Sequence, residues 1–377
     1  MTARPTRPTR STIVTGALAA YALSSVVAIG MSAEGPDGGA WDPKAAAAYL
    51  DARTAWWTTW PNASRDHGTF CVSCHTAVPY ALARPALRTM MGERERTATE
   101  VKLLENVVKR VSLWNEVAPF YPDQLRGLPK TSESRGTEAI LNALILASRD
   151  AENGGLTEET RAAFRNMWAL QMRTGDLSGA WAWLDFHYEP WESQGAPYFG
   201  ASLAALAVGT APADYAAGAD IQDNLKLLRD YFQRGYEHQP LFNRLMLLWA
   251  STKSTGLLAP AQRQSIVDAA FREQRDDGGW STASLGTWKR LDGSVLDTHS
   301  DGYATGLATL ALQQAGLSAR DARVARGLDW LNRNQVRTTG HWAASSLNKE
   351  RDPATDIGRF MSDAATAFAV LSLTHAR

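Results

Sequence analysis

Two apolar patterns alternate along this chain from about residue 41 to its end. In one pattern, apolar residues recur at helical spacing opposite a charged face, as in Ala319–Gln335. In the other, Ala, Gly and Leu occupy nearly every side of the helix, as in His299–Ala315. Amphipathic helices belong on a surface, whereas helices that are apolar all round must be buried on most sides. The alternation therefore predicts an all-α fold built from outer–inner helix hairpins.

Six such hairpins are predicted. The outer helices are Pro43–Thr59, Thr97–Asn115, Thr157–Gln171, Ile221–Gln233, Ala261–Gln274 and Ala319–Gln335, and the inner helices are Ala77–Met90, Ser134–Ser148, Ser193–Gly209, Gln239–Ser251, His299–Ala315 and Arg359–Thr374. Pro79 and Pro85 interrupt the inner helix of the first pair. Because polar capping repeats are not evident, six hairpins favour a closed (α/α)6 toroid over an open solenoid.

Three of the outer helices end in a related turn, in which Gln is followed by Gly and then by Trp. The three sets are Gln171, Gly179 and Trp181; Gln274, Gly278 and Trp280; and Gln335, Gly340 and Trp342. The Gln side chain can bond free backbone groups at a helix end, and Gly permits a turn with positive φ. We expect the Trp to seal the junction between neighbouring hairpins.

These turns, with Ser300–Gly306 and Ser362–Thr366, resemble the terpenoid cyclase and protein prenyltransferase superfamily, especially the C-terminal half of squalene–hopene cyclases. The resemblance covers roughly residues 260–377 and is fainter back to about residue 130. It implies an (α/α)6 toroid whose inner helices surround a deep pocket. The acidic Asp-x-Asp-Asp motif of the cyclases is absent from this chain, so cyclase activity is disfavoured and no catalytic residue is transferred.

Charge and cysteine content narrow the class of function. The 377 residues include 39 Lys and Arg and 39 Asp and Glu, so the formal net charge is zero, which excludes a general nucleic-acid binder. The 14 Trp residues indicate a repeated structural role or an aromatic-lined site. The two cysteines, Cys71 and Cys74, both lie in one short motif.

That motif, Cys71-Val72-Ser73-Cys74-His75, is the attachment sequence of a c-type haem. The two thiols would each add to a vinyl group of one porphyrin, and His75 would be the proximal iron ligand. A structural zinc site usually needs four ligands, and a thioredoxin-like disulfide needs a βαβ context, yet both remain alternatives. The motif predicts one covalent haem c, held by Cys71, Cys74 and His75.

In a closed ring the sixth hairpin lies beside the first, which brings Met361 near the predicted haem. We therefore predict Met361 as the second protein ligand to the iron, opposite His75. The alternatives are His187, His299, His341, Met90 and Met91.

Residues 1–33 have the layout of a secretory signal. Arg4, Arg7 and Arg10 precede Thr12–Gly30, an apolar run without charge. The run is long enough to act instead as an uncleaved membrane anchor. Both interpretations predict a periplasmic or otherwise extracytoplasmic protein, with residues 41–377 forming one toroid domain.

Together, these features predict an exported c-type haem protein that transfers electrons, and an oxidoreductase if it turns over a substrate. The expected partners are a redox protein or a hydrophobic small molecule. One alternative is a non-redox enzyme like the terpenoid cyclases or prenyltransferases, with a structural Cys pair. Another is a module that binds a hydrophobic ligand. Two further features stand out: the aromatic and acidic loop Trp181–Trp191 as a candidate lid, and Asp301 as a helix cap or catalytic acid.

Overall fold

The helices of the computed structural model, which describes residues 40–123, 129–212 and 215–376, form an outer and an inner set. The outer helices are α1 (Pro43–Trp57), α3 (Ala98–Ser112), α5 (Glu158–Ala169), α7 (Gln222–Gly235), α9 (Pro260–Arg272) and α11 (Ala322–Arg333). The inner helices are α2 (Ala77–Met91), α4 (Lys130–Asn153), α6 (Ala196–Thr210), α8 (Leu241–Lys253), α10 (Gly302–Gln314) and α12 (Phe360–His375). The predicted order of outer and inner helices is confirmed at every position.

Short elements lie in the connections. Strands β1 (Ser64–Arg65) and β2 (Thr69–Phe70) form an antiparallel ribbon between α1 and α2, around the 3₁₀ turn η1 (Asp66–Gly68). The other 3₁₀ turns are η2 (Ala219–Ile221), η3 (Tyr236–His238), η4 (Thr282–Leu285) and η5 (Ile357–Arg359).

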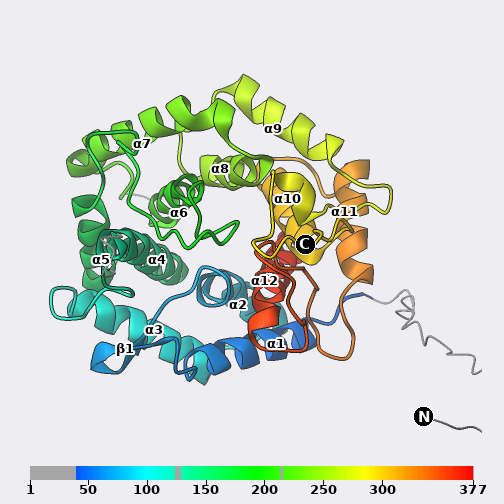
Figure 1. Cartoon of the computed structure of the whole chain (residues 1–377), viewed down its shortest axis with the longest axis horizontal. Helices are drawn as coiled ribbons and strands as arrows, with labels where there is room; N and C mark the ends of the chain where they lie inside the picture. Colours follow the sequence, from blue (N-terminus) through cyan, green and yellow to red (C-terminus); the bar gives the residue numbers. More distant parts are fainter. Residues whose placement is uncertain (1–39, 124–128, 213–214, 377) are drawn as a thin grey trace, which may run out of the picture. The chain divides into compact units, whose positions relative to one another are not determined.

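The inner helices of the unit Gly38–Arg377 form a closed ring (Figure 1). Each inner helix contacts the next one along the chain, and α12 also contacts α2. Outer helices sit over the junctions, so that α1 contacts both α2 and α12. The predicted (α/α)6 toroid is therefore confirmed.

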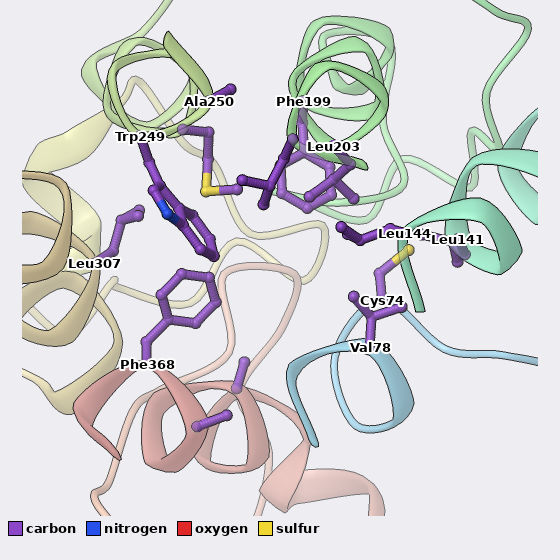
Figure 2. Packing of buried hydrophobic residues seen from close by; sticks show 14 of the residues in the cluster. Cys74, Val78, Leu141, Leu144, Phe199, Leu203, Trp249, Ala250, Leu307 and Phe368 are labelled. Carbon is purple, nitrogen blue, oxygen red and sulfur yellow. The ribbon is translucent and has the colours of Figure 1, made fainter. Parts of the chain in front are cut away.

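The middle of the ring is filled by apolar side chains. Phe199 on α6, Trp249 on α8 and Phe368 on α12 point toward one another, and Cys74 lies at the edge of the same cluster (Figure 2). Every residue of α10 except Gln314 is buried. The Ala and Gly residues of these inner helices let neighbouring backbones approach closely. Because the helices are buried on most sides, their sequences are apolar all round.

Helix α2 continues through both of its prolines. Pro79 lies in the first turn, where a backbone N–H has no helical partner, so its missing donor removes no bond. Pro85 lies inside the helix and removes one backbone bond. Contacts with α1, α4 and α12 hold the helix together despite that loss.

The Gln-Gly-Trp turns join neighbouring hairpins. The amide of Gln274 donates both to the carbonyl of Gly278, 2.8 Å away in its own turn, and to that of Arg323, 2.8 Å away on α11. Trp280 donates from Nε1 back to the carbonyl of Ala270, at 2.6 Å. Gln171 and Trp181 repeat this arrangement toward α7. In both turns, the Gln side chain therefore also binds the next outer helix.

The third turn carries this link across the closure of the ring. Gln335 accepts from the backbone N–H of Asp42, at 2.6 Å, and donates to its carbonyl, at 2.9 Å, so the last hairpin binds the start of α1. Gly340 has a φ of 79°, and a Cβ there would lie 2.3 Å from the carbonyl group of Ala45. The glycine is therefore required both by the turn and by the close approach of α1.

A buried carboxylate makes a second connection across the closure. Asp363 of α12 accepts from Nε of Arg53, at 2.7 Å, and from the hydroxyl of Tyr49, at 2.9 Å, both on α1. It also accepts from the hydroxyl of Thr76, at 2.7 Å, at the start of α2. Arg53 is also paired with Asp356, whose side chain is half exposed. Asp363 therefore ties α1, α2 and α12 together.

Substitutions at Asp363 and Asp356 compare what the buried and the half-exposed carboxylate each contribute to the free energy of unfolding. Asp363→Asn leaves the buried guanidinium of Arg53 without its inner partner, so we expect the free energy of unfolding to fall by about 3–5 kcal/mol. Asp356→Asn removes the half-exposed partner and should cost less than about 1 kcal/mol. Urea denaturation followed by circular dichroism measures both. Equal effects of the two substitutions would show that Asp363 does not hold the closure.

Candidate functional site

The candidate site lies at the end of the ring where the inner helices begin, which we call the rim. Every connection from an outer to an inner helix lies there, and three of them are long: residues 170–195, 273–301 and 334–359. Long connections at one end of a rigid scaffold commonly carry functional residues. The Cys71–His75 segment belongs to the same end, just before α2.

The Cys-x-x-Cys-His segment folds as the start of α2. The hydroxyl of Ser73 accepts from the backbone N–H groups of Thr76, at 3.2 Å, and Ala77, at 3.0 Å, which supplies a side-chain acceptor at the helix start. The carbonyl of Cys71 accepts from Nε1 of Trp57, at 2.7 Å. Both thiols are free, with Cys71 6% and Cys74 4% exposed. Burial raises the pKa of the Cys71 thiol to about 12, so these thiols are poor nucleophiles.

The imidazole of His75 is enclosed by aromatic rings. Its centroid lies 3.9 Å from that of Phe360, in a stacked arrangement, and 5.0 Å from that of Trp57, edge-on. Nδ1 lies 2.8 Å from the hydroxyl of Thr76, which in turn donates to Asp363. Because the Thr76 hydroxyl donates its hydrogen bond to Asp363, it accepts one from Nδ1 of His75. Burial lowers the pKa of His75 to about 3, so the ring is neutral.

The residues predicted as iron ligands lie in different surroundings. Phe360, and not its neighbour Met361, lies against the His75 ring, and Met361 is 4% exposed within the core. His341 stacks on Tyr49, while His187 and His299 pair with Asp185 and Asp297 at the surface. Across residues 40–123, 129–212 and 215–376, no three His, Cys, Asp or Glu side chains gather as a metal site.

Asp301 caps α10. Its carboxylate accepts from the backbone N–H groups of Tyr303 and Ala304 and from both the N–H and the hydroxyl of Thr282, at 2.6 to 2.9 Å. Burial raises its pKa to about 6. Three of the four hydrogen bonds end on Oδ1 and one on Oδ2, and the two from the α10 backbone are those of a helix cap, so the capping role accounts for this residue.

The loop before α6 is held rigidly. A backbone bridge joins Tyr188 and Glu192, with both N–H···O distances at 2.8 Å, and Nε1 of Trp183 donates to the carbonyl of Trp191, at 2.7 Å. Lys130 donates to the carbonyl of Asp185. These bonds attach the segment to α4 and join its two arms, so that it forms one wall of the rim.

Glu192 belongs to the same loop and acts electrostatically on the two thiols. Within the described part of the chain, no group donates a hydrogen bond to its carboxyl, and its charge is felt by both Cys71 and Cys74. Burial raises the pKa of Glu192 to about 7, and Lys130 offsets only part of that effect. Glu192 is therefore a proton-carrying group near neutral pH.

The same loop lines one side of a groove of about 390 Å³. Three connections line it: the loop before α6 with Glu189, the segment before α8 with Glu237 and His238, and the segment after η4 with Trp288. Burial raises the pKa of Glu189, helped by the nearby Asp185 charge, while Ser193 donates to Oε2 at 2.6 Å. Glu237 is exposed.

Sequence reasoning identified only part of this groove. Glu189 falls inside the loop Trp181–Trp191, which was a candidate lid because of its aromatic and acidic residues. Glu237 and Trp288 were missed because they stand in separate connections with no motif spacing between them. The polar run Glu237–Gln239 directly before an apolar inner helix was the signal available for them.

Neither a protein-family model nor a curated protein matches this sequence. Among solved structures, a polysaccharide lyase is similar with a TM-score of 0.51 and 13% identity, covering 88% of this chain and 96% of that one. A glycosidase is similar with a TM-score of 0.47 and 12% identity, covering 87% of this chain and 97% of that one. The likeness to the lyase shows a shared fold.

The predicted function, electron transfer, is wrong. The likeness in fold is to a polysaccharide lyase and not to an electron carrier. Around the Cys71–His75 segment, Phe360 covers the His75 ring and both thiols are packed in the core, where the five residues form the start of a buried helix. The covalent haem c at Cys71, Cys74 and His75 stays a prediction.

No helix of residues 40–123, 129–212 or 215–376 has the length and apolar character needed to span a bilayer. The predicted signal or anchor, residues 1–33, lies outside the described residues.

Buried thiols give a direct test of this packing. We expect Cys71 and Cys74 to resist a thiol reagent in the folded protein at about pH 8 and to react rapidly once the protein is unfolded, because burial disfavours their thiolates. Absorbance of the released chromophore measures both rates. Rapid modification of the folded protein would contradict the core position of the two side chains.

Glu192 makes stability depend on pH. Its pKa rises on folding from the ordinary value of 4.5 to about 7, so the unfolded chain releases this proton first and stability is lost as pH rises through that window. We expect Glu192→Gln to raise the free energy of unfolding by up to about 3 kcal/mol at about pH 8, and by much less at about pH 5. Urea denaturation at both values measures the change.

The matched control is Glu273→Gln, at an exposed position at the end of α9. It should leave the pH dependence unchanged. A Glu192→Gln protein that shows the same pH dependence as the unmodified chain would mean that Glu192 is ionised in the folded state.

Proposed function

We propose that this chain is an enzyme that cleaves glycosidic bonds in a polysaccharide, with Glu189 and Glu237 on the rim groove as its two carboxyl groups. One observation carries the proposal: two glutamates from different connections line a single groove in contrasting environments, one half-buried and one exposed. Glycoside hydrolysis requires such a pair, because one carboxyl group must donate a proton while the other acts as a base or nucleophile.

Glu189 suits the role of general acid. Burial raises its pKa, so it holds a proton at a higher pH than an exposed glutamate. That proton would pass to the glycosidic oxygen as the bond from this oxygen to the anomeric carbon breaks. Ser193 holds the carboxyl group from one side, and the bridge between Tyr188 and Glu192 fixes the backbone that carries it.

Glu237 suits the complementary role. It is exposed on the 3₁₀ turn before α8, where water solvates the charged form. As a base it would take a proton from a water molecule whose oxygen adds to the anomeric carbon. The hydroxyl of that water ends on one sugar and the proton from Glu189 on the other, which balances the hydrolysis.

The fold is consistent with this function without deciding it, since a shared fold does not fix chemistry. The polysaccharide lyase found among solved structures has the same fold, which makes an enzyme acting on a polymer a reasonable candidate. Glu192 is not assigned a role in cleavage, because it lies outside the lining of the groove.

Loss of the acid should abolish most of the activity. We expect Glu189→Gln to lower kcat by about 10²–10⁴-fold on the polysaccharide that the unmodified protein cleaves, the usual contribution of a general acid. The unmodified protein should lose activity as pH rises through the elevated pKa of Glu189, because the acid must be protonated. Release of reducing ends from a panel of polysaccharides measures both effects, with Glu273→Gln as the control.

Two results would contradict these roles. One is full activity in both Glu189→Gln and Glu237→Gln. The other is a product that carries a carbon–carbon double bond, detected by ultraviolet absorbance, since that product arises by elimination and not by hydrolysis.

A further inference from the structure

We infer that the rim groove is selective for neutral pyranosides with equatorial hydroxyls, one ring of which lies on the indole of Trp288. The inference rests on the proposed function and adds the class of sugar. It comes from three properties of the groove: an aromatic wall held in place, an amide oxygen in the lining that accepts no bond from the described residues, and a lining without Lys or Arg.

The aromatic wall is Trp288. Its Nε1 donates to the carbonyl of Thr282, at 2.9 Å, and the edge of its ring packs on the backbone of Gly286, where a Cβ would lie 2.3 Å from the indole. Phe242 meets the ring edge-on, with centroids 6.3 Å apart. The remaining surface of the indole stays partly exposed and lines the groove.

A fixed indole with an open surface favours one class of ligand. A pyranose whose hydroxyls are equatorial presents a flat layer of C–H groups, which packs on an apolar ring surface. An axial hydroxyl would point into the indole and lose its hydration without a hydrogen-bond partner. The wall therefore favours gluco- and xylo-configured sugars over manno-configured ones.

The acceptor is the side-chain amide of Asn243, in the first turn of α8. The side chain is 3% exposed, and its Nδ2 donates to Oε1 of Gln239, at 2.7 Å, and to the carbonyl of Gly195, at 3.3 Å. Among the described residues, none donates to its Oδ1, although Asn243 lines the groove. A sugar hydroxyl in the groove could donate to this oxygen in place of water.

The lining disfavours acidic sugars. The ionisable groups that line the groove are Glu189, Glu237 and His238, and no Lys or Arg is among the described lining residues. A uronate carboxylate would therefore lose hydration without gaining a guanidinium or ammonium partner. The polar groups of the groove instead suit the donors and acceptors of uncharged hydroxyls.

Calorimetric binding to the Glu189→Gln protein tests the inference without interference from cleavage. Three probes differ in one property each: cellohexaose is neutral and equatorial, β-1,4-mannohexaose is neutral with an axial hydroxyl, and a β-1,4-glucuronate hexamer is equatorial and charged. We expect cellohexaose to bind at least about tenfold more tightly than either of the others.

Variants at the wall complete the test. Adding Trp288→Ala should weaken cellohexaose binding by at least about tenfold, whereas Trp288→Phe should retain most of it. Gly286→Ala should also weaken binding, because the added Cβ displaces the indole. The backbone there has a φ of −169°, which any residue adopts, so this variant keeps the test valid if Trp288→Ala is unstable. Trp114→Ala, remote from the groove lining, is the control.

The inference is overturned if the glucuronate or manno-hexamer binds as tightly as cellohexaose, or if the changes at Trp288 and Gly286 leave binding intact. Failure of the proposed function gives a different result. In that case the predicted sugar selectivity persists, but the unmodified protein releases no reducing ends from any polymer of the bound sugar.

Discussion

The buried carboxylate of Asp363 is the interaction on which the closed ring most depends. It lies on the last helix, and its partners Tyr49, Arg53 and Thr76 lie on the first helix and at the start of the second. A chain of hairpins with an open end would expose the apolar flanks of α2 and α12, and the cost of that exposure grows with buried area. The carboxylate, with the link from Gln335 to Asp42, selects the closed arrangement.

Closure also determines what the Cys71–His75 segment can do. The hydroxyl of Thr76 binds Asp363 and receives the Nδ1 proton of His75, so the imidazole is held by the same network that closes the ring. Phe360, from the other side of the closure, then stacks on the ring. The side chains of the Cys71–His75 segment are therefore packed against their neighbours. The groove with free polar groups lies elsewhere on the rim, among the connections that lead to α6, α8 and α10.

The architecture could be predicted because it follows from local patterns. Apolar periodicity distinguishes Ala319–Gln335 from His299–Ala315, and a Gln-Gly-Trp turn indicates where one hairpin meets the next. The site could not be predicted in the same way, since Glu189, Glu237 and Trp288 meet only through tertiary contacts. The electron-transfer function inferred from the Cys-x-x-Cys-His motif was wrong, and whether Phe360 or Met361 faces His75 depends on helix rotation, which composition does not fix.

The most direct measurement of the central claim is an experimental structure of the Glu189→Gln protein soaked with cellohexaose. The account predicts a sugar ring on the indole of Trp288, with a glycosidic oxygen within hydrogen-bond distance of the side chain at position 189 and Glu237 facing the anomeric carbon. Sugar bound beside the Cys71–His75 segment, with the groove between Glu189 and Trp288 left unoccupied, would contradict it.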